Sequence, residues 1–595
     1  MLRLAGDVTE RTVTVYMTGA LCTQPAQVLQ SEQAERVIQV YLNRLLHRRS
    51  ERLALFGRLD CAGTSRTPSP AARQLARLLG LLVDLPPEEI KVKAPDVAPL
   101  AADPPALAEL VEDLYDHWRS FERYLIFEGG ADESRDRAVE GHMPFIQNNE
   151  HLTALVREAY RRIERSLRGH WPRVYRQVPA GANMSLLIDQ VTWPCPAGPY
   201  EALRDVRFVR LALLKLPVIL YPRRNFRKGR FVRIERNPLE GVTLDPRQWL
   251  CLPVRVGELC VLVFYDTEYM SLATSLVNIF ELSGHAEARR KPDAILVFGV
   301  SEPTDWGELT AFYVDEAEDL VVGAVAKSED VDYFGYFKKM ILTLHNVIMM
   351  RRGRLPLHGA MCRIRLRAGP TFSLALVGDS AAGKSETLDA FQSLAAEWIS
   401  DLTVIFDDMG SLALAADGTL LGYGTEIGAF VRLDDLDPGF AFGHLDRSVL
   451  MSPERNNARV VLPLTQYKDV VAGCPVDMLL YANNYEAVTE DSPALEAFGD
   501  AGEALHVFRT GSRASKGTTD EQGLVSSYFA NPFGPPQFRE LHEELAQRYF
   551  HAAYQRGVFV GQLRTRLGIA GFEREGPRQA AEGLFRWLME RRRDT

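Results

Sequence analysis

Hydrophobic residues in the first third of the chain recur at helical spacing. Val37, Tyr41 and Leu45, for example, are four residues apart and would lie on one face of a helix. A segment rich in Pro and Ala, 97–106, interrupts this pattern as a connector. We therefore expect a mainly α-helical region over residues 1–195. The predicted helical segments within it are 31–60, 70–84, about 107–127 and about 150–168.

The pattern changes from about residue 205, where short runs rich in Val, Ile, Leu and Phe appear. Such runs are typical of β-strands, and here they alternate with segments at helical spacing. The predicted strands are 218–221, 259–264, 294–298, 372–377 and 402–406, and the predicted helices are 271–282, 333–350, 536–555 and 577–592. This alternation predicts the α/β fold class, with one α/β domain over 196–330 and a second domain over 331–595.

The composition is that of a globular protein. The chain has 595 residues, 46% apolar and 25% charged, with a net charge of −9, which argues against general nucleic-acid binding. A basic run at 223–230 indicates a solvated face or a small anionic substrate. No apolar stretch is long enough to span a bilayer, and seven scattered cysteines without a signal peptide predict reduced thiols. We expect a cytoplasmic protein with no membrane or nucleic-acid partner.

The clearest chemical motif is a glycine-rich loop between a predicted strand and a predicted helix. Gly378-x-x-x-x-Gly383-Lys384-Ser385 matches the phosphate-binding loop of nucleotide-binding proteins. The glycines let backbone N–H groups approach phosphate oxygens, Lys384 reaches the β- and γ-phosphates, and the Ser385 hydroxyl ligates Mg²⁺. The predicted nucleotide-binding residues are Gly378, Asp379, Ser380, Ala381, Ala382, Gly383, Lys384, Ser385 and Glu386.

Two further features become informative beside this loop. Asp407 and Asp408 end a predicted strand, and carboxylates placed at a sheet edge hold a divalent metal or act as a base. Taken alone such a pair is as often a turn, but an upstream phosphate-binding loop favours the functional interpretation. The second feature comprises Tyr333, Lys339 and His358. An aromatic cluster and a lone histidine are usually structural, and their spacing is what changes that interpretation here.

Together these motifs resemble the phosphoenolpyruvate carboxykinase superfamily, which also contains the HPr kinase/phosphorylases. In the carboxykinases a Tyr, a Lys six residues later and a His nineteen residues after that surround the catalytic metal. Tyr333, Lys339 and His358 reproduce both separations. The family's loop has a Ser at its third position, as Ser380 is here. The second Asp of its Asp-Asp pair is a metal ligand, which points to Asp408.

The resemblance covers residues 250–595 and implies a carboxykinase-like mixed-sheet nucleotide-binding domain. A downstream segment looks like the family's segment with a phosphate-bridging Arg, which gives Arg459. Glu426 and Arg432 fall where the family has a Glu and a Lys near the nucleotide, although such charges are more often ordinary surface residues. The stretch 509–534 is similar to its mobile lid, whose closure would exclude water, and a plain surface loop is almost as good an interpretation.

A site of this family implies two divalent ions. Mg²⁺ would bridge the phosphates of ATP through Ser385, and Mn²⁺ suits the nitrogen-rich second set. A Lys amine ligates a metal only when deprotonated, so the pKa of Lys339 must be depressed. Lys384 and Arg459 would neutralise charge on the transferring phosphoryl group, and the family counterparts of Tyr333 and Ser380 face the substrate. The predicted metal ligands are Lys339, His358, Ser385 and Asp408. The predicted catalytic residues are Lys384, Arg459, Asp407, Ser380 and Tyr333.

Several features depart from the carboxykinase pattern. The loop continues Ser385-Glu386-Thr387 and His358 is followed by Gly-Ala, both nearer the HPr kinases. The Arg-Ser-Pro-x-Asp-Lys segment with which carboxykinases grip the substrate carboxylate is missing, and position alone supports the run 223–230 as a substitute. The first 190 residues resemble no family that we can name.

Three functions are compatible with these motifs. The first is conversion of oxaloacetate and ATP to phosphoenolpyruvate, CO₂ and ADP. The second is a kinase for a hydroxyl of a small molecule or a protein serine, on the same scaffold. The third is a nucleotide-binding regulatory protein without turnover, which a full set of metal ligands disfavours. The expected partner is thus a small anionic or hydroxyl-bearing substrate; ATP, GTP and pyrophosphate stay open as donors, and no oligomeric state is indicated.

Overall fold

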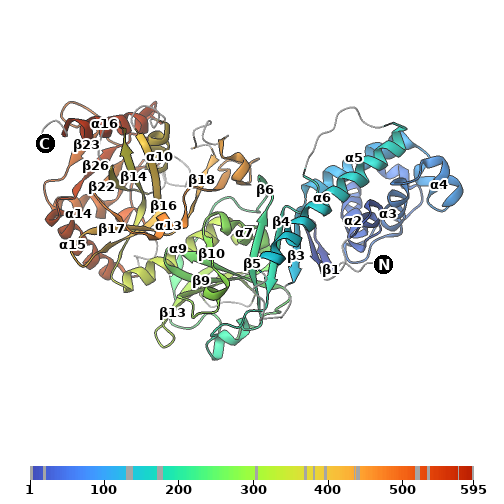
Figure 1. Cartoon of the computed structure of the whole chain (residues 1–595), viewed down its shortest axis with the longest axis horizontal. Coiled ribbons are helices and arrows are strands. Elements are labelled where there is room, and N and C mark those ends of the chain that lie inside the picture. Colours follow the sequence, from blue (N-terminus) through green and yellow to red (C-terminus); the bar gives the residue numbers. More distant parts are fainter. Residues whose placement is uncertain are drawn as a thin grey trace. The chain divides into compact units, whose positions relative to one another are not determined.

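The structure is a computed structural model of the 595-residue chain. It describes residues 5–17, 22–128, 138–170, 179–301, 306–367, 371–379, 382–393, 399–433, 436, 443–515, 523–532, 537–573 and 575–591. The protein is mixed α/β, with several mixed sheets, about 38% helix and 29% strand. It forms two compact units (Figure 1), which we call the N-terminal unit (Met1–Gln190 with Val209–Leu216) and the C-terminal unit (Val191–Phe208 with Pro217–Thr595).

The N-terminal unit combines helices with a small sheet. Its strands are β1 (Ala5–Val8), β2 (Thr12–Met17), β3 (Glu122–Glu128), β4 (Met184–Asp189) and, from residue 209 on, β5 (Arg207–Leu214). β1 and β2 are antiparallel, whereas β2, β3 and β4 are parallel neighbours. The helices are α1 (Pro25–Leu29), α2 (Glu32–His47), α3 (Pro70–Leu82), α4 (Pro87–Lys93), α5 (Pro104–Ser120) and α6 (Ala138–Arg168), with 3-10 turns η1 (Glu51–Phe56) and η2 (Ala98–Ala101).

The prediction of a mainly helical first region misses this sheet. Helices α2, α3, α5 and α6 overlap the four predicted segments, but the segment 107–127 splits into α5, which ends at Ser120, and the strand β3. The first five residues of β3 are all buried. A parallel strand buried on both faces lacks the alternation of apolar and polar residues that identifies a strand, so its sequence extends the apparent helix.

The first sheet of the C-terminal unit has the strand order β8-β9-β11-β13-β12-β7. These strands are β8 (Trp249–Val256), β9 (Leu259–Asp266), β11 (Ala294–Val300), β13 (Leu320–Ala326), β12 (Thr310–Asp315) and β7 (Phe231–Arg233), and the short β10 (Glu281–Leu282) pairs with β8. β9, β11 and β13 are parallel to one another. Helix α9 (Phe334–Arg351) packs on this sheet, where the ring of Phe337 stacks on that of Phe298 with centroids 3.7 Å apart.

The second sheet has the order β21-β17-β16-β14-β15-β22-β26-β23. Its strands are β21 (Cys474–Pro475), β17 (Leu420–Gly424), β16 (Ile399–Leu414), β14 (Leu355–Leu366), β15 (Thr371–Val377), β22 (Met478–Asn483), β26 (Phe559–Arg564) and β23 (Leu495–Ala497). A smaller sheet contains β18 (Gly428–Arg432), β20 (Arg459–Pro463), β19 (Val449–Met451) and β6 (Val218–Leu220), and β24 (Ser512–Ala514) forms a hairpin with β25 (Leu524–Ser526).

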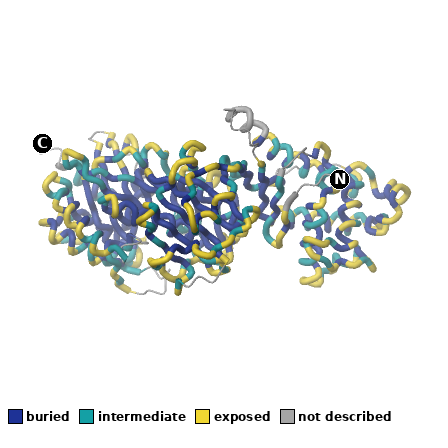
Figure 2. The backbone as a smooth tube through the Cα atoms, turned by 90° about the horizontal axis from the view of Figure 1, so that it is seen from below, coloured by how far each residue is buried: buried dark blue, intermediate teal, exposed yellow. Residues whose placement is uncertain are grey.

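Helices cover both faces of the second sheet. Leu355 and Leu357 of β14 join a core with α14 (Ala501–Thr510) and α15 (Arg539–Gln555). Cys362 and Ile364, on the alternate face of the same strand, join another core with α10 (Lys384–Ser393) and α16 (Glu575–Arg591). The strands are accordingly buried along most of their length (Figure 2). The remaining short helical elements are η3 (Gly198–Leu203), η4 (Thr267–Tyr269), α7 (Met270–Ser275), η5 (Leu276–Asn278), α8 (His285–Ala288), η6 (Glu329–Val331), η8 (Leu445–Arg447), α13 (Tyr467–Val471) and η9 (Tyr528–Ala530).

Most predicted elements of this unit are confirmed. The strands predicted at 218–221, 259–264, 294–298 and 372–377 are β6, β9, β11 and β15, and the helices predicted at 333–350, 536–555 and 577–592 are α9, α15 and α16. The predicted helix 271–282 is wrong beyond Asn278, where the chain turns into β10. The predicted strand 402–406 is also longer: β16 begins at Ile399, continues to Leu414 and is an interior strand. Asp407 and Asp408 therefore lie within the sheet and not at its edge.

Candidate active site

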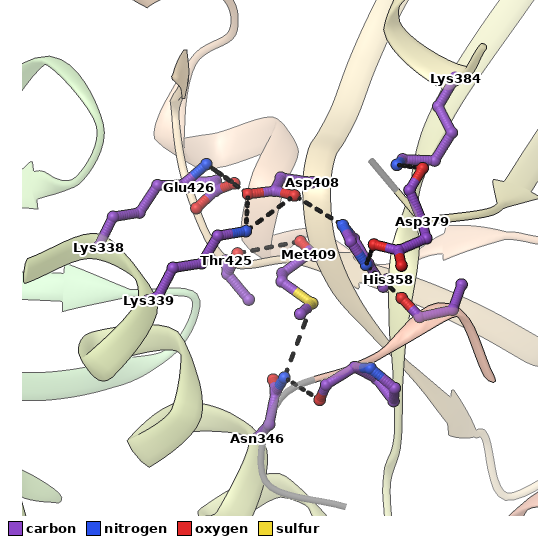
Figure 3. Close-up of polar contacts among 12 residues, drawn as sticks. Lys338, Lys339, Asn346, His358, Asp379, Lys384, Asp408, Met409, Thr425 and Glu426 are labelled. Atoms are coloured by element: carbon purple, nitrogen blue, oxygen red, sulfur yellow. Dashed lines mark hydrogen bonds and ion pairs between the residues drawn. The ribbon is translucent and has the colours of Figure 1, made fainter. Parts of the chain in front are cut away.

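The phosphate-binding loop follows the carboxyl end of β15 and leads into α10. Gly383 has a φ of +94°, and a Cβ there would be 2.7 Å from Thr565 Oγ1, so glycine is required. The Thr565 hydroxyl donates a hydrogen bond to the Ala382 carbonyl at 2.8 Å. The Lys384 ammonium folds back over the loop and donates to the Asp379 carbonyl at 3.0 Å (Figure 3). The loop thus holds its lysine close to its own backbone.

The loop is also attached to the neighbouring strand β14. The backbone N–H of Gly378 donates to the His358 carbonyl at 3.0 Å, and a Cβ on Gly378 would lie 2.7 Å from Ala382 Cβ. Glu386 lies in the first turn of α10. Two predicted loop residues, Ser380 and Ala381, and the side chain of the predicted Mg²⁺ ligand Ser385 lie outside the described part of the chain.

Four side chains next to this loop form a polar cluster, which we call the Asp408 cluster: Lys338 and His358, which are buried, and Lys339 and Asp408, which are partly exposed (Figure 3). Asp408 Oδ2 lies 2.6 Å from Lys338 Nζ and 3.1 Å from Lys339 Nζ. Asp408 Oδ1 lies 2.9 Å from His358 Nε2. The structure therefore brings together three of the predicted metal ligands, Lys339, His358 and Asp408.

Helix α9 and two paired strands position these groups. Lys338 and Lys339 lie in the first turns of α9, which begins at Phe334. In the β14–β16 pair, His358 is opposite Met409 and Gly359 is opposite Asp408, so the histidine and the carboxylate are on adjacent strands. Asp408 adopts a φ of +115°, which residues with a Cβ rarely do and which surrounding structure must enforce.

His358 connects the cluster to the phosphate-binding loop. Its Nδ1 makes a short hydrogen bond with the Ala530 carbonyl and lies 3.6 Å from Asp379 Oδ1. The other carboxylate oxygen of Asp379 lies 3.1 Å from Arg513 Nε. A chain of polar contacts therefore runs from Arg513 through the loop and His358 to Asp408.

The two lysines of the cluster have opposite pKa shifts. Burial lowers the pKa of Lys339 to about 8, opposed by Asp408 and assisted by the like charge of Lys338. Burial acts against the charge of Lys338 as well, but the carboxylates of Asp408 and Glu426 outweigh it and raise its pKa. Lys338 is thus a fixed cation, and Lys339 is the more easily deprotonated of the two amines.

The pKa values of Asp408 and His358 are also shifted, by burial and by different neighbouring charges. Burial would raise the pKa of Asp408, but Lys338 and Lys339 outweigh it and hold that pKa well below its ordinary value. Burial, together with the positive charge of Lys384, lowers the pKa of His358 despite its contact with Asp408. The cluster therefore holds an ionised carboxylate beside a neutral imidazole.

Glu426 lies behind the cluster and is completely buried. Its Oε1 is 3.2 Å from Lys338 Nζ, so Lys338 bridges the carboxylates of Glu426 and Asp408. Burial raises the pKa of Glu426 to about 8, against the attraction of Lys338. Among the described residues, neither carboxyl oxygen of Glu426 has a well-aligned hydrogen bond.

Three further predicted residues, Tyr333, Arg432 and Arg459, form a second set around the ring of Phe430, which we call the Phe430 group. The ring of Phe430 lies 5.8 Å from that of Tyr333 and 5.4 Å from the Arg459 guanidinium carbon. Arg432 and Arg459 are directly opposite each other in the β18–β20 pair. Tyr333 is the N-cap residue of α9, so the same helix serves both sets. Asp407 belongs to neither; it is buried on β16 opposite Ala360, and its charge contributes to the raised pKa of Lys338.

Sequence reasoning missed two members of the site. Lys338 had a detectable signal, since it is a second lysine in a helix that is otherwise mostly apolar, and such a group must find buried carboxylates. Arg513 had none, because its partner Asp379 is 134 residues away in the chain.

Comparison with protein families and curated proteins does not identify the site. Neither a family model nor a curated protein sequence matches the chain. Among the described residues, no three His, Cys, Asp or Glu side chains gather closely enough to hold a metal ion, so the candidate set consists of one His, one Asp and a Lys amine. Within the same part of the chain, no helix is both long and apolar enough to cross a membrane.

Proposed function

We propose that the protein is a metal- and nucleotide-dependent phosphotransferase with a carboxykinase-like site. The observation that carries this proposal is the position of His358, whose ring lies between the Asp408 carboxylate and Asp379 of the phosphate-binding loop (Figure 3). A cation held by His358 and Asp408 would be a neighbour of the phosphates that the loop binds. Binding of ATP at this loop rests on the motif and on its strand–loop–helix setting.

The hydrogen bonding of His358 supports a cation at this position. A carbonyl oxygen only accepts, so the contact with Ala530 requires a proton on His358 Nδ1. In the neutral ring, Nε2 then presents a lone pair to the Asp408 carboxylate 2.9 Å away. Two electron-rich groups facing each other are stabilised by a positive charge between them, and an imidazole nitrogen with a carboxylate oxygen is a common pair of metal ligands.

The residues fit Mn²⁺ in that place. Lys339 supplies a third donor when its amine is neutral, and burial favours the neutral form by lowering the pKa to about 8. A set with two nitrogen donors suits Mn²⁺ better than Mg²⁺, whose place would be at Ser385 and the nucleotide phosphates. When bound, such an ion supplies positive charge for the phosphoryl group in transfer. Lys384 and Arg459 would add charge to the same group.

An anionic substrate is supported by the positive groups near Arg459. The basic run 223–230 lies beside the segment that leads into β20, since Arg455 Nη1 donates to the Arg223 carbonyl at 2.9 Å. Arg223 and Arg224 of this run pair with the carboxylates of Glu329 and Asp330, which leaves the other basic side chains of the run for a carboxylate or phosphate of a substrate. The reaction that fits best is therefore conversion of oxaloacetate and ATP to phosphoenolpyruvate, CO₂ and ADP.

A kinase acting on the hydroxyl of a small molecule or a protein serine is the alternative. It is favoured by the loop ending Ser385-Glu386-Thr387 and by the missing carboxylate-gripping segment. On this alternative, a carboxylate such as Asp407 would take the hydroxyl proton, as bases do in other kinases. Both functions use the same metal and nucleotide groups and differ only in the acceptor.

An acceptor screen separates these functions. The full-length protein is incubated with ATP, Mg²⁺ and Mn²⁺ and with oxaloacetate, and phosphoenolpyruvate is measured; the reverse direction uses phosphoenolpyruvate, ADP and bicarbonate. We expect turnover in both directions, and no turnover with Lys384→Ala. Phosphorylation of a polyol or a protein serine without oxaloacetate decarboxylation would favour the kinase, and ATP binding without transfer to any acceptor would contradict both. Lys468→Ala, at an exposed lysine, is the matched control.

A further inference from the structure

Helix α9 carries a buried amide two turns beyond Lys339. Asn346 follows Lys339 by seven residues and therefore lies on the same face of the helix. Its side chain is completely buried. Asn346 Nδ2 donates to the Pro532 carbonyl at 2.9 Å and lies 3.7 Å from Met409 Sδ (Figure 3). Its Oδ1 lies 2.9 Å from His345 Nδ1, and because an amide oxygen only accepts, His345 is the donor.

The segment that receives this hydrogen bond has an unusual backbone. Phe529, Ala530 and Asn531 have φ angles of 45°, 58° and 58°, a left-handed run without a glycine. Residues with a Cβ adopt this conformation only when their surroundings enforce it. The ring of Phe529 is completely buried and packs on Phe508 and Phe550, which fixes one end of the run.

The conformation of this segment directs two carbonyl groups toward the site. The Ala530 carbonyl accepts the short hydrogen bond from His358 Nδ1, and the Pro532 carbonyl accepts from Asn346. The left-handed run is therefore held at Phe529 by packing and at Pro532 by Asn346. Between these two points lies the carbonyl that orients the His358 ring.

We propose that Asn346 is a positioning residue for His358, acting through the backbone of residues 529–532. By holding the Pro532 carbonyl, Asn346 keeps the Ala530 carbonyl on His358 Nδ1 and so keeps Nε2 directed at Asp408. Partners of this kind fix the tautomer and the orientation of histidine ligands in metal sites. The inference rests on the proposed function for the metal, but the effect on the His358 ring exists in the metal-free protein.

The first measurement uses the metal-free protein. Histidine ring ¹⁵N shifts are recorded on the labelled full-length chain, with His358→Ala to assign the His358 signal. We expect a neutral ring with the proton on Nδ1 in the unaltered protein, and a mixture of tautomers in Asn346→Leu, which removes the donor at similar volume. An unchanged His358 signal in Asn346→Leu would overturn the inference. This result does not depend on whether the site binds a metal.

The second measurement titrates Mn²⁺ into the same proteins and follows the free ion by electron paramagnetic resonance. Asn346→Leu should bind Mn²⁺ about 10- to 100-fold more weakly, the usual effect of removing such a supporting group. Thr343→Val is the matched control, because Thr343 is equally buried on α9 but bonds within the helix, to the Lys339 carbonyl at 2.8 Å; it should bind Mn²⁺ normally.

The outcomes separate this inference from the proposed function. Failure of the unaltered protein to bind Mn²⁺ contradicts the proposed function, and the tautomer measurement then decides the inference by itself. Mn²⁺ binding by Asn346→Leu equal to that of the unaltered protein contradicts the inference alone. Asn346→Ala removes the same donor without adding apolar bulk, and it replaces the leucine variant if thermal unfolding shows that the latter does not fold.

Discussion

The Asp408 cluster and the Phe430 group share the start of helix α9 but balance charge in opposite ways. In the cluster, lysine ammonium groups lie against carboxylates, so positive and negative charges are paired within the protein. In the Phe430 group, Arg432 and Arg459 are directly opposite each other on antiparallel strands, so residues of like charge are neighbours. Under the proposed function, the first region would hold the metal ion and the second would face the anionic substrate.

The largest expected effect follows from removing groups that touch the phosphates or the metal. Lys384→Ala and His358→Ala should each lower the rate of phosphoryl transfer by at least about 10³-fold, since each removes charge or a ligand at the reacting group. Steady-state turnover with saturating ATP is the measurement. Lys468→Ala should keep normal turnover, and normal turnover in either site variant would refute the assignment.

Lys338→Met should mainly affect stability. It removes the ammonium that bridges Asp408 and Glu426 and leaves the buried Glu426 carboxyl group and the partly exposed Asp408 carboxylate with less compensation. Breaking a buried pair in this way costs about 3–5 kcal/mol in the free energy of unfolding. Urea denaturation at neutral pH measures the loss. A decrease of less than about 1 kcal/mol, the size of an exposed ion pair, would show that the cluster is not held by Lys338.

Changes in the Phe430 group should lower the turnover of the substrate and leave the affinity for the metal unchanged. Arg459→Ala should lower kcat/KM for an anionic acceptor by about 10²-fold, because it removes a charged partner of the transferring or accepting group. The affinity for Mn²⁺ should not change, since Arg459 contacts Phe430 and not the Asp408 cluster. Weaker Mn²⁺ binding in this variant would show that the Phe430 group also contributes to metal binding, and would contradict separate roles for the two regions.

The smallest expected effect is a dependence of the free energy of unfolding on pH. The pKa of Glu426 is raised to about 8 in the folded protein from an ordinary value of 4.5, so the folded state binds more protons than the unfolded state between these two pH values. Stability should therefore fall as pH rises through this window. Glu426→Gln should remove that decline. Free energies of unfolding at pH 5, 6.5 and 8 provide the test, and an identical slope in the two proteins would contradict a raised pKa.

A second titration opposes this trend above pH 8. The pKa of Lys339 is lowered to about 8 from 10.5, so the unfolded state binds more protons between these values and stability should rise with pH there. Lys339→Met should abolish the rise. The two titrations can be told apart because Glu426 acts below about pH 8 and Lys339 acts above it.

The sequence predicts the elements of the C-terminal unit well because each has a strong local signal. The run 372–377, the helix 333–350 and the glycines of the phosphate-binding loop are examples. The resemblance to the carboxykinases implies that Lys339 and His358 meet, and the structure brings both to Asp408.

The features that the sequence does not predict depend on contacts between residues far apart in the chain. Asp408 was expected at a sheet edge, but β16 continues past it because its following residues pair with β14. The hydrogen bonds of His358 to Ala530 and of Asp379 to Arg513 join residues more than a hundred positions apart, and no local pattern reports such contacts. The strand β3 was hidden because it is buried on both faces.

The central claim is that His358 and Asp408 hold a divalent ion beside the phosphate-binding loop. Electron spin echo spectroscopy of Mn²⁺ bound to the full-length protein, labelled with ¹⁵N only at histidine, tests it most directly. We predict a coupling to one histidine nitrogen that disappears in His358→Ala while the phosphates of added ATP remain coupled to a bound ion. Mn²⁺ binding without any histidine coupling, or with a coupling that survives in His358→Ala, would contradict the account.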